Sequence, residues 1–264
     1  MDEHREHREH HRGQEPALKA AAIDQLRLLD VQALDARIDQ LAHRRATLPE
    51  HAALQDLEKA LSELADNLVA AETEESDVSR ELRKAEGDVD QVRARAVRDQ
   101  QRLDAGQVGS PKELEGLQHE IATLARRQSD LEDVVLEIME RLESVQERHS
   151  ELSAQRAESE AKVAELTASR DTTTTQIDAE VGGLQAQRDT QAGQLDTELM
   201  ALYEKIRGQQ AGIGAAELKQ RRCTGCRLEL NNVEIAQLRS AEEDEVLRCE
   251  ECRRILVRTA ESGL

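Results

Sequence analysis

Aromatic residues are almost absent from this sequence of 264 residues. It contains no Phe, no Trp and a single Tyr, Tyr203. A compact globular core usually draws much of its buried area from aromatic side chains, so the composition argues against a large globular core. Proline is also rare, with three residues. Ala, Leu, Glu, Arg, Gln and Asp predominate instead, as is typical of long coiled coils.

Long apolar runs and a positive net charge are absent too. No stretch approaches 18 uncharged apolar residues and no apolar signal core begins the chain, so we expect a cytoplasmic protein with no membrane partner. The formal net charge of −19 repels nucleic acid and confines any such contact to a local basic surface. No paired catalytic carboxylates, nucleophile–base set or phosphate-binding glycine loop occurs, which predicts a non-enzymatic protein. The heavy use of Arg and Ala is associated with high-GC bacteria.

Two long heptad patterns flank a short segment at residues 105–110. Apolar residues at a 3.5-residue repeat form a seam that supercoils against a partner helix. The segment holds two glycines, and Ser110, Pro111 and Glu113 suit the N-cap, the first position and the capping-box acid of the next helix. Because so short a connection places two helices side by side, the sequence predicts a mainly α protein with a long antiparallel coiled-coil hairpin.

The seam positions are apolar with few exceptions. Those before the tip are Leu54, Leu57, Leu61, Leu64, Leu68, Ala71, Glu75, Val78, Leu82, Ala85, Val89, Val92, Ala96, Asp99 and Leu103. Those after it are Leu114, Leu117, Ile121, Leu124, Gln128, Leu131, Val135, Ile138, Leu142, Val145, His149 and Leu152. We interpret the polar residues Gln128 and His149 as satisfied or register-setting residues rather than as ligands.

We expect four segments along the chain. They are a disordered His-rich tail (1–15), the coiled-coil hairpin (16–207), a linker (208–218) and a C4 zinc ribbon (219–264). The tail composition predicts a solvated terminus, with metal contact as the alternative role of its His residues. Within the hairpin, a first helix starting near Pro16 is interrupted at Pro49, which cannot donate the helix hydrogen bond. The arm after the tip continues to about Arg207, with a looser base where the sequence is rich in Thr and Gly.

Two C-x-x-C pairs carry the chemistry, Cys223 with Cys226 and Cys249 with Cys252, separated by 22 residues. Four thiolates on two tight turns can close a tetrahedral shell around one structural Zn²⁺, with no open position for catalysis. Iron is the alternative occupant, and a thioredoxin-like redox pair lacks its βαβ context. A ribbon of about forty residues buries too little apolar area to fold alone, so the metal supplies much of its folding energy.

Short strands are expected beside both cysteine pairs. The candidates are residues 228–230, 246–248 and 254–257, and residues 232–241 form either a short helix or an irregular loop. Basic residues also surround the pairs: Arg221, Arg222, Arg227, Arg253, Arg254 and Arg258, with Lys219 nearby. They are candidates for contact with phosphate or with a protein partner, or they offset the neighbouring acidic residues. No aromatic residue interleaves them, so base stacking is excluded.

These features resemble a bacterial family of coiled-coil hairpin proteins with a C-terminal C4-type zinc ribbon. The resemblance rests on the segments 111–121, 131–140, 202–207, 223–226 and 249–256. The family usually has glycine where Arg253 stands. The resemblance implies a zinc-stabilised scaffold that binds proteins, and in flagellated relatives it implies links to an alternative sigma factor and to flagellar messenger RNA.

We therefore expect a non-enzymatic adaptor that binds a protein partner, with the transcription or translation machinery as the candidate source. Two alternatives stay open: nucleic-acid binding through the arginine-edged ribbon, and a structural oligomeric rod. A monomer and a homodimer both fit the sequence. Tyr203 is expected to pack where the helix ends beside the ribbon, with its ring buried and its hydroxyl in water.

Overall fold

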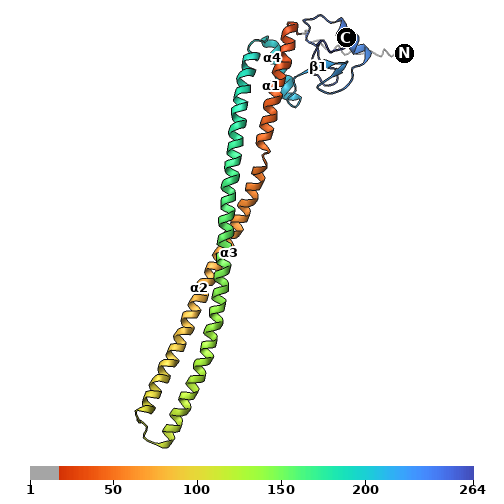
Figure 1. The fold of residues 1–264 in the computed structure, drawn as a ribbon. Coiled ribbons are helices and arrows are strands. Elements are labelled where there is room, and N and C mark those ends of the chain that lie inside the picture. Colours follow the sequence, from red (N-terminus) through yellow and green to blue (C-terminus); the bar gives the residue numbers. More distant parts are fainter. Residues whose placement is uncertain (1–17) are drawn as a thin grey trace, which may run out of the picture. The chain divides into compact units, whose positions relative to one another are not determined.

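The computed structural model describes residues 18–264, and the predicted tail lies outside them. The helices are α1 (Ala22–Ala46), α2 (Pro49–Asp104), α3 (Pro111–Ala192), α4 (Thr197–Gln209) and α5 (Asn232–Ser240). The strands are β1 (Ala215–Lys219), β2 (Arg222–Cys223) and β3 (Ile255–Val257). The predicted fold class, a long helical hairpin with a small C-terminal β ribbon, is confirmed (Figure 1).

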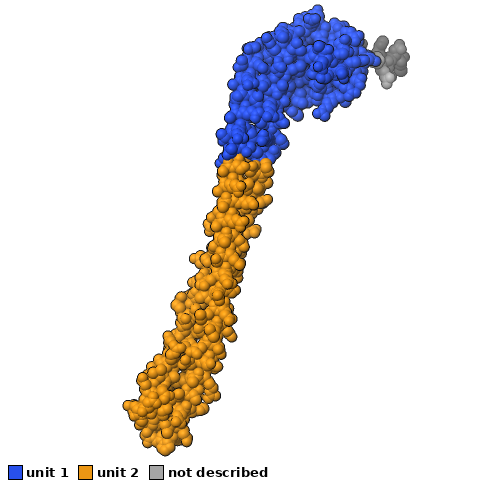
Figure 2. Space-filling model, viewed as in Figure 1, with its two compact units in different colours: residues 1–48, 171–264 blue, residues 49–170 orange. Residues whose placement is uncertain are grey.

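The chain divides into two units, which Figure 2 shows in blue and orange. The orange unit, Pro49–Arg170, contains α2 and the first part of α3. Its seam follows the predicted heptads: all the positions before the tip are buried or half-buried, and after the tip Leu114 alone is exposed. Most of the buried seam residues recur at multiples of seven on each helix, at Ala71, Val78 and Ala85 on α2 and at Leu124, Ile138 and Val145 on α3, and Val89 of α2 is buried at the other seam position.

Two of the polar seam residues face each other across the hairpin. His149 Nδ1 lies 3.5 Å from Glu75 Oε2, and Gln146 donates a hydrogen bond of 3.1 Å to the other oxygen of Glu75. Among residues 18–264 the structure groups His149 with no set of metal-ligating side chains. The interpretation of His149 as a satisfied polar seam residue therefore agrees with its contacts.

The tip uses the predicted capping residues in a shifted arrangement. Gly106 has a φ of +64°, a backbone conformation that glycine adopts without steric cost. The hydroxyl of Ser110 accepts a hydrogen bond of 3.3 Å from the N–H of Glu113. The carboxylate of Glu113 accepts from the N–H of Gly109 at 2.8 Å, one residue earlier than a capping box requires.

The blue unit of Figure 2 contains residues up to Leu48 and Asp171–Leu264. Here α1 lies beside the C-terminal part of α3. The ion pairs Arg37–Glu180 (2.8 Å) and Arg45–Asp178 (2.9 Å) join the two helices. Leu28 and Val31 of α1 are fully buried against the side chains of α4.

The descending arm is not continuous, which differs from the prediction. Helix α3 ends at Ala192, and α4 begins at Thr197 after a short turn that contains Gly193. Asp196 caps α4, because its side chain accepts hydrogen bonds from the N–H groups of Glu198 (2.9 Å) and Leu199 (3.0 Å). The break lets Leu195 and Leu199 enter the core of this unit.

The ribbon sheet has the order β2-β1-β3, with β2 antiparallel and β3 parallel to β1. Strand β1 begins inside the segment that was expected to be a linker. Because side chains alternate across a strand, the sheet has two apolar faces. Ala215, Ile255 and Val257 pack on α1 and α4. Leu218 and Leu256 lie on the other face with the cysteines and with α5.

The segment before α1 also pairs with the ribbon, so α1 begins later than predicted. The N–H of Ala20 donates to the carbonyl of Asp244 at 2.8 Å, and the N–H of Val246 donates to the carbonyl of Leu18 at 2.9 Å. Lys19 forms ion pairs with Glu242 (2.6 Å) and Asp244 (3.2 Å). These contacts hold residues 18–20 extended along the ribbon.

Candidate metal centre

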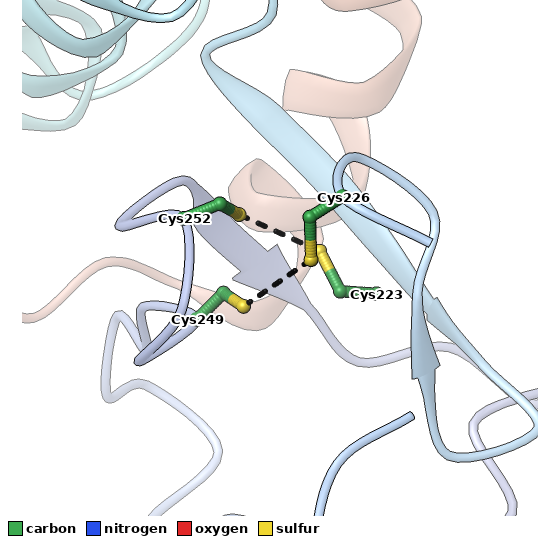
Figure 3. A group of neighbouring side chains, drawn as sticks. All are labelled: Cys223, Cys226, Cys249 and Cys252. Carbon is green, nitrogen blue, oxygen red and sulfur yellow. Dashed lines mark hydrogen bonds between the residues drawn. The ribbon is translucent and has the colours of Figure 1, made fainter. Parts of the chain in front are cut away.

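The four cysteines converge on one point in the ribbon (Figure 3). Their sulfur atoms all lie within 4.8 Å of one another. Cys223 ends β2 and Cys226 follows it in a tight turn, whereas Cys249 and Cys252 occupy the turn before β3. Cys223 and Cys249 are buried, and the other two are half-buried. The structure thus brings together all four predicted ligand residues.

The two C-x-x-C turns have the same backbone hydrogen bonds. In the first, the N–H of Arg227 donates to the carbonyl of Cys223 at 2.7 Å; in the second, that of Arg253 donates to Cys249 at 2.8 Å. Arg227 and Arg253 both have positive φ angles, +66° and +61°. Arg253 therefore adopts the left-handed conformation that favours glycine, the residue usual in the resembling family at this position.

The sulfur separations fit a tetrahedral metal site. Zinc–thiolate bonds of about 2.3 Å in a tetrahedron place neighbouring sulfur atoms about 3.8 Å apart. The Cys223–Cys252 and Cys226–Cys249 sulfur distances are 3.8 and 3.9 Å, drawn as dashed lines in Figure 3. Free sulfur atoms need no such four-fold convergence, whereas a metal with four thiolate ligands does.

Burial governs the acidity of these thiols. It raises the pKa of Cys223 to about 11 and raises the pKa of Cys249 further. Burial also opposes ionisation of Cys252, but hydrogen bonds from Arg254 and from neighbouring thiols outweigh it and lower the pKa of Cys252. The buried thiols of Cys223 and Cys249 therefore hold their protons unless a cation replaces them, which is the chemistry of a structural zinc site.

Two of the six candidate contact arginines serve inside the ribbon. Arg254 is half-buried and donates to the carbonyls of Ile213 (3.1 Å) and Gln210 (2.9 Å). Arg258 donates to the carbonyls of Leu238 (3.1 Å) and Ala241 (2.9 Å), at the end of α5. These guanidinium groups satisfy backbone carbonyls in partly buried hydrogen bonds, so they are not a free surface for a partner.

The other candidates differ in exposure. Arg222, Arg227 and Arg253 are exposed, and Arg222 lies 3.3 Å from Glu229 in an exposed ion pair. Arg221 is half-buried and donates to the side chain of Asn232. The structure thus reduces the predicted basic edge to three exposed arginines, which we call the arginine edge: Arg222, Arg227 and Arg253.

Polar residues of α1 hold the ribbon in place, a role that the sequence did not reveal. Gln32 accepts hydrogen bonds from the N–H groups of Gly214 (2.7 Å) and Ala215 (3.2 Å) and donates to the carbonyl of Gly212 (3.1 Å). Gln25 donates to the carbonyl of Glu243 in the ribbon at 3.3 Å and to that of Ala20 at 3.0 Å. Their spacing on the buried stripe of α1 is the signal that could have identified them.

Tyr203 is fully buried, and the expectation of a solvated hydroxyl is wrong. Its hydroxyl donates a hydrogen bond of 2.6 Å to Asp35, whose carboxylate also lies 3.1 Å from Arg188 and 3.4 Å from Arg207. Burial, followed by the hydrogen bond to Asp35, raises the pKa of Tyr203. A Cβ added at Gly214 would lie 2.6 Å from the Tyr203 ring, so close packing excludes a larger residue there.

The fold and the cysteine cluster define a coiled-coil hairpin protein with a C4-type zinc ribbon. The chain belongs to the family described as the CT398-like coiled coil hairpin domain, which matches residues 31–211, and a C4-type zinc ribbon domain matches residues 222–256. The resemblance inferred from the sequence is therefore confirmed.

Relatives from mycobacteria match almost the whole chain. The protein Rv2229c of Mycobacterium tuberculosis (strain ATCC 25618 / H37Rv), named as uncharacterized, is 36% identical over 241 residues, 91% of this chain and 98% of the relative. ML1638 of Mycobacterium leprae, also named as uncharacterized, is 29% identical and covers 81% of this chain and 92% of its own length.

Two solved structures share the architecture. A structure from Mycobacterium smegmatis is 34% identical, with a TM-score of 0.78, and covers 92% of this chain and 100% of that one. CT398 from Chlamydia trachomatis is 18% identical, with a TM-score of 0.64 and coverage of 90% and 98%, a likeness that concerns the fold alone. Within residues 18–264, no helix is both long and apolar enough to span a membrane.

Proposed function

We propose that this protein is a non-enzymatic adaptor whose ribbon, held by one structural Zn²⁺, binds a protein partner. The observation that carries the proposal is the convergence of four cysteine sulfur atoms behind an exposed arginine edge. Cys223, Cys226, Cys249 and Cys252 would hold the ion. A closed site with four thiolates offers no position for a substrate, so its role is to fix the turns that carry Arg227 and Arg253.

The helices support this role because the ribbon packs against them and is held in a fixed position. One sheet face packs on α1 and α4, and the cysteine face packs on α5, so the two C-x-x-C turns project from a folded core. Arginine is enriched at protein interfaces because its planar guanidinium binds carboxylates through two hydrogen bonds. The edge therefore suits an acidic surface on a partner protein of the cytoplasm.

Metal content is the first test. We expect about one zinc per chain by elemental analysis, and about four thiols that react with a thiol reagent only after chelation. The Cys223→Ser/Cys249→Ser variant should lose the metal. Stoichiometric iron in place of zinc, or four thiols that react without chelation, would contradict the zinc assignment.

Partner binding is the second test, made by affinity capture from the source lysate with and without nuclease. The variant Arg222→Glu/Arg227→Glu/Arg253→Glu reverses the arginine edge and leaves the cysteines in place. The matched control, Arg80→Glu/Arg83→Glu/Arg98→Glu, makes the same charge change on the exposed surface of α2. We expect partners that survive nuclease, are retained by the control and are lost from the edge variant.

Nucleic acid is the competing ligand of the same edge, because three exposed arginines could also contact phosphates. Partners that disappear after nuclease treatment, and binding that weakens steeply with salt, would favour it over a protein partner. The acidic remainder of the chain would then limit non-specific adhesion to nucleic acid.

A further inference from the structure

The two flanks of the α2–α3 hairpin, on either side of the apolar seam, differ in chemistry. Three ion pairs between the helices lie on one flank, at Glu74–Arg148, Glu81–Arg141 (3.2 Å) and Arg95–Glu120 (2.7 Å), whereas the opposite flank has the pair Arg93–Glu132 (3.2 Å). The members of the first three pairs recur at multiples of seven on both helices, so they share one heptad position beside the seam. We call this side the ion-paired flank.

The opposite side, which we call the open flank, contains Glu86 and Arg93 of α2 and Glu132, Leu136 and Met139 of α3. Leu136 is 57% exposed and Met139 48% exposed. Because they are three residues apart on a helix, they lie on the same face. Large apolar side chains gathered this way on a surface rich in charges mark an interaction site more often than isolated ones do.

A groove of about 300 Å³ lies along the open flank between the two helices. Val89, Val135 and Leu136 give it an apolar floor and wall. Glu86, Asp90, Arg93 and Glu132 line its rim. A shallow groove between two packed helices, with apolar residues along it, has the shape that accepts a third helix.

The rim carries more negative than positive charge. Arg93 is the one cation, and it is already shared between Asp90 (3.4 Å) and Glu132 (3.2 Å). Glu86 has no cationic partner among residues 18–264. A helix that enters this groove would therefore be favoured by Lys or Arg beside its apolar stripe, since the acidic rim attracts cations and repels carboxylates.

We propose that the open flank binds a basic amphipathic helix of a partner protein, in a helix-in-groove mode. Leucine-like anchors at spacings of three and four residues would fill the space between Val89 and Leu136, and Met139 would adapt to them, because its unbranched thioether fits irregular surfaces. A second copy of this chain fits less well, because its groove brings the same excess of carboxylates. The inference rests on the adaptor function and adds a second binding surface to it.

The test is fluorescence anisotropy with labelled peptides of about 20 residues, about 30 Å of helix, and the full zinc-loaded chain. One peptide has leucines on one face flanked by lysines, a second replaces the lysines by glutamates, and a third replaces the leucines by serines. The protein variants are Leu136→Glu/Met139→Glu and the control Val134→Glu. Val134 is exposed to a similar extent, 43%, and lies on the side of the ion-paired flank.

We expect only the lysine–leucine peptide to bind the wild-type chain. Its dissociation constant should rise at least about tenfold for Leu136→Glu/Met139→Glu and stay unchanged for Val134→Glu. Absence of binding, equal binding of the glutamate or serine peptide, or binding that Leu136→Glu/Met139→Glu leaves unchanged would overturn the proposal. Self-association abolished by that variant would identify a second copy as the occupant instead. Loss of lysate partners from the arginine-edge variant but not from the open-flank variant would leave the adaptor function intact and reject this surface.

Discussion

At the scale of single residues, the hydrogen bond between Tyr203 and Asp35 is the most buried polar contact between α1 and α4. Tyr203→Phe removes the hydroxyl that donates to the buried carboxylate of Asp35. That carboxylate loses one hydrogen bond, although Arg188 and Arg207 remain beside it. We expect the free energy of unfolding to fall by about 1–3 kcal/mol in denaturant titrations. Asp39→Asn, which changes a half-exposed ion pair of Arg207, is the control and should cost less than about 1 kcal/mol.

The same hydroxyl sets a dependence on alkaline pH. The folded protein raises the pKa of Tyr203 above its usual value of about 10. Its contribution to stability is therefore fully present below about pH 10 and is lost as the pH rises towards the folded-state pKa. The stability difference between the wild type and Tyr203→Phe should stay constant from about pH 7 to 9 and shrink above about pH 10. A difference that widens above pH 10 would contradict this account.

Arg253 shows how one residue can lie in an unfavourable backbone conformation without disrupting a site. Its φ of +61° costs a residue with a Cβ about 1 kcal/mol relative to glycine. We expect Arg253→Gly to raise the free energy of unfolding of the zinc-loaded chain by about 0.5–1 kcal/mol. Arg83→Gly, at an exposed position in the interior of α2, is the opposite control and should lower it by a similar amount. An equal effect of both changes would mean that lost charge, not backbone conformation, determines the result.

At the scale of elements, Glu75 and His149 form a polar contact in an otherwise apolar part of the seam. Polar residues at such positions fix the register of a coiled coil at a cost in stability. We expect Glu75→Leu/His149→Leu to raise the midpoint of thermal unfolding, with a gain of about 1–2 kcal/mol for two half-buried leucines. Circular dichroism would measure it. A lower midpoint would show that the contact stabilises the hairpin more than apolar packing could.

The hairpin could be predicted from the sequence because heptads and capping residues are local signals. The same kind of signal marked the start of α4, where Asp196 precedes a helical stretch, but the continuing apolar stripe hid the break after Gly193. Strand β1 is not recognisable in the sequence, because its alternation is short and two of its residues are alanine. The roles of Arg254 and Arg258 depend on which carbonyls the tertiary fold brings within reach, and no spacing in the sequence encodes that.

At the scale of the whole molecule, the ribbon and the helices of its unit share one core. Leu28 and Val31 of α1, Tyr203 of α4 and Ile255 and Val257 of β3 pack in a single cluster. On the other sheet face, Leu218, Leu256 and Cys223 belong to the cluster that contains the cysteines. The strands therefore connect the candidate metal centre to the helices, so we expect a metal bound there to stabilise more than the ribbon.

Metal removal tests this coupling through amide hydrogen exchange of the full chain before and after chelation. We expect faster exchange in residues 215–257 and also in α1 and α4, whose buried face rests on the sheet. The unit Pro49–Arg170 has its own apolar seam and should keep its protection, so it is the internal control. The variant Cys223→Ser/Cys249→Ser should reproduce the pattern without chelator. If the helices share one core with the ribbon, loss of the strands must also speed exchange at Leu28 and Val31 of α1. Unchanged protection of α1 and α4 while the ribbon loses its own would therefore show that the helices fold independently of the metal.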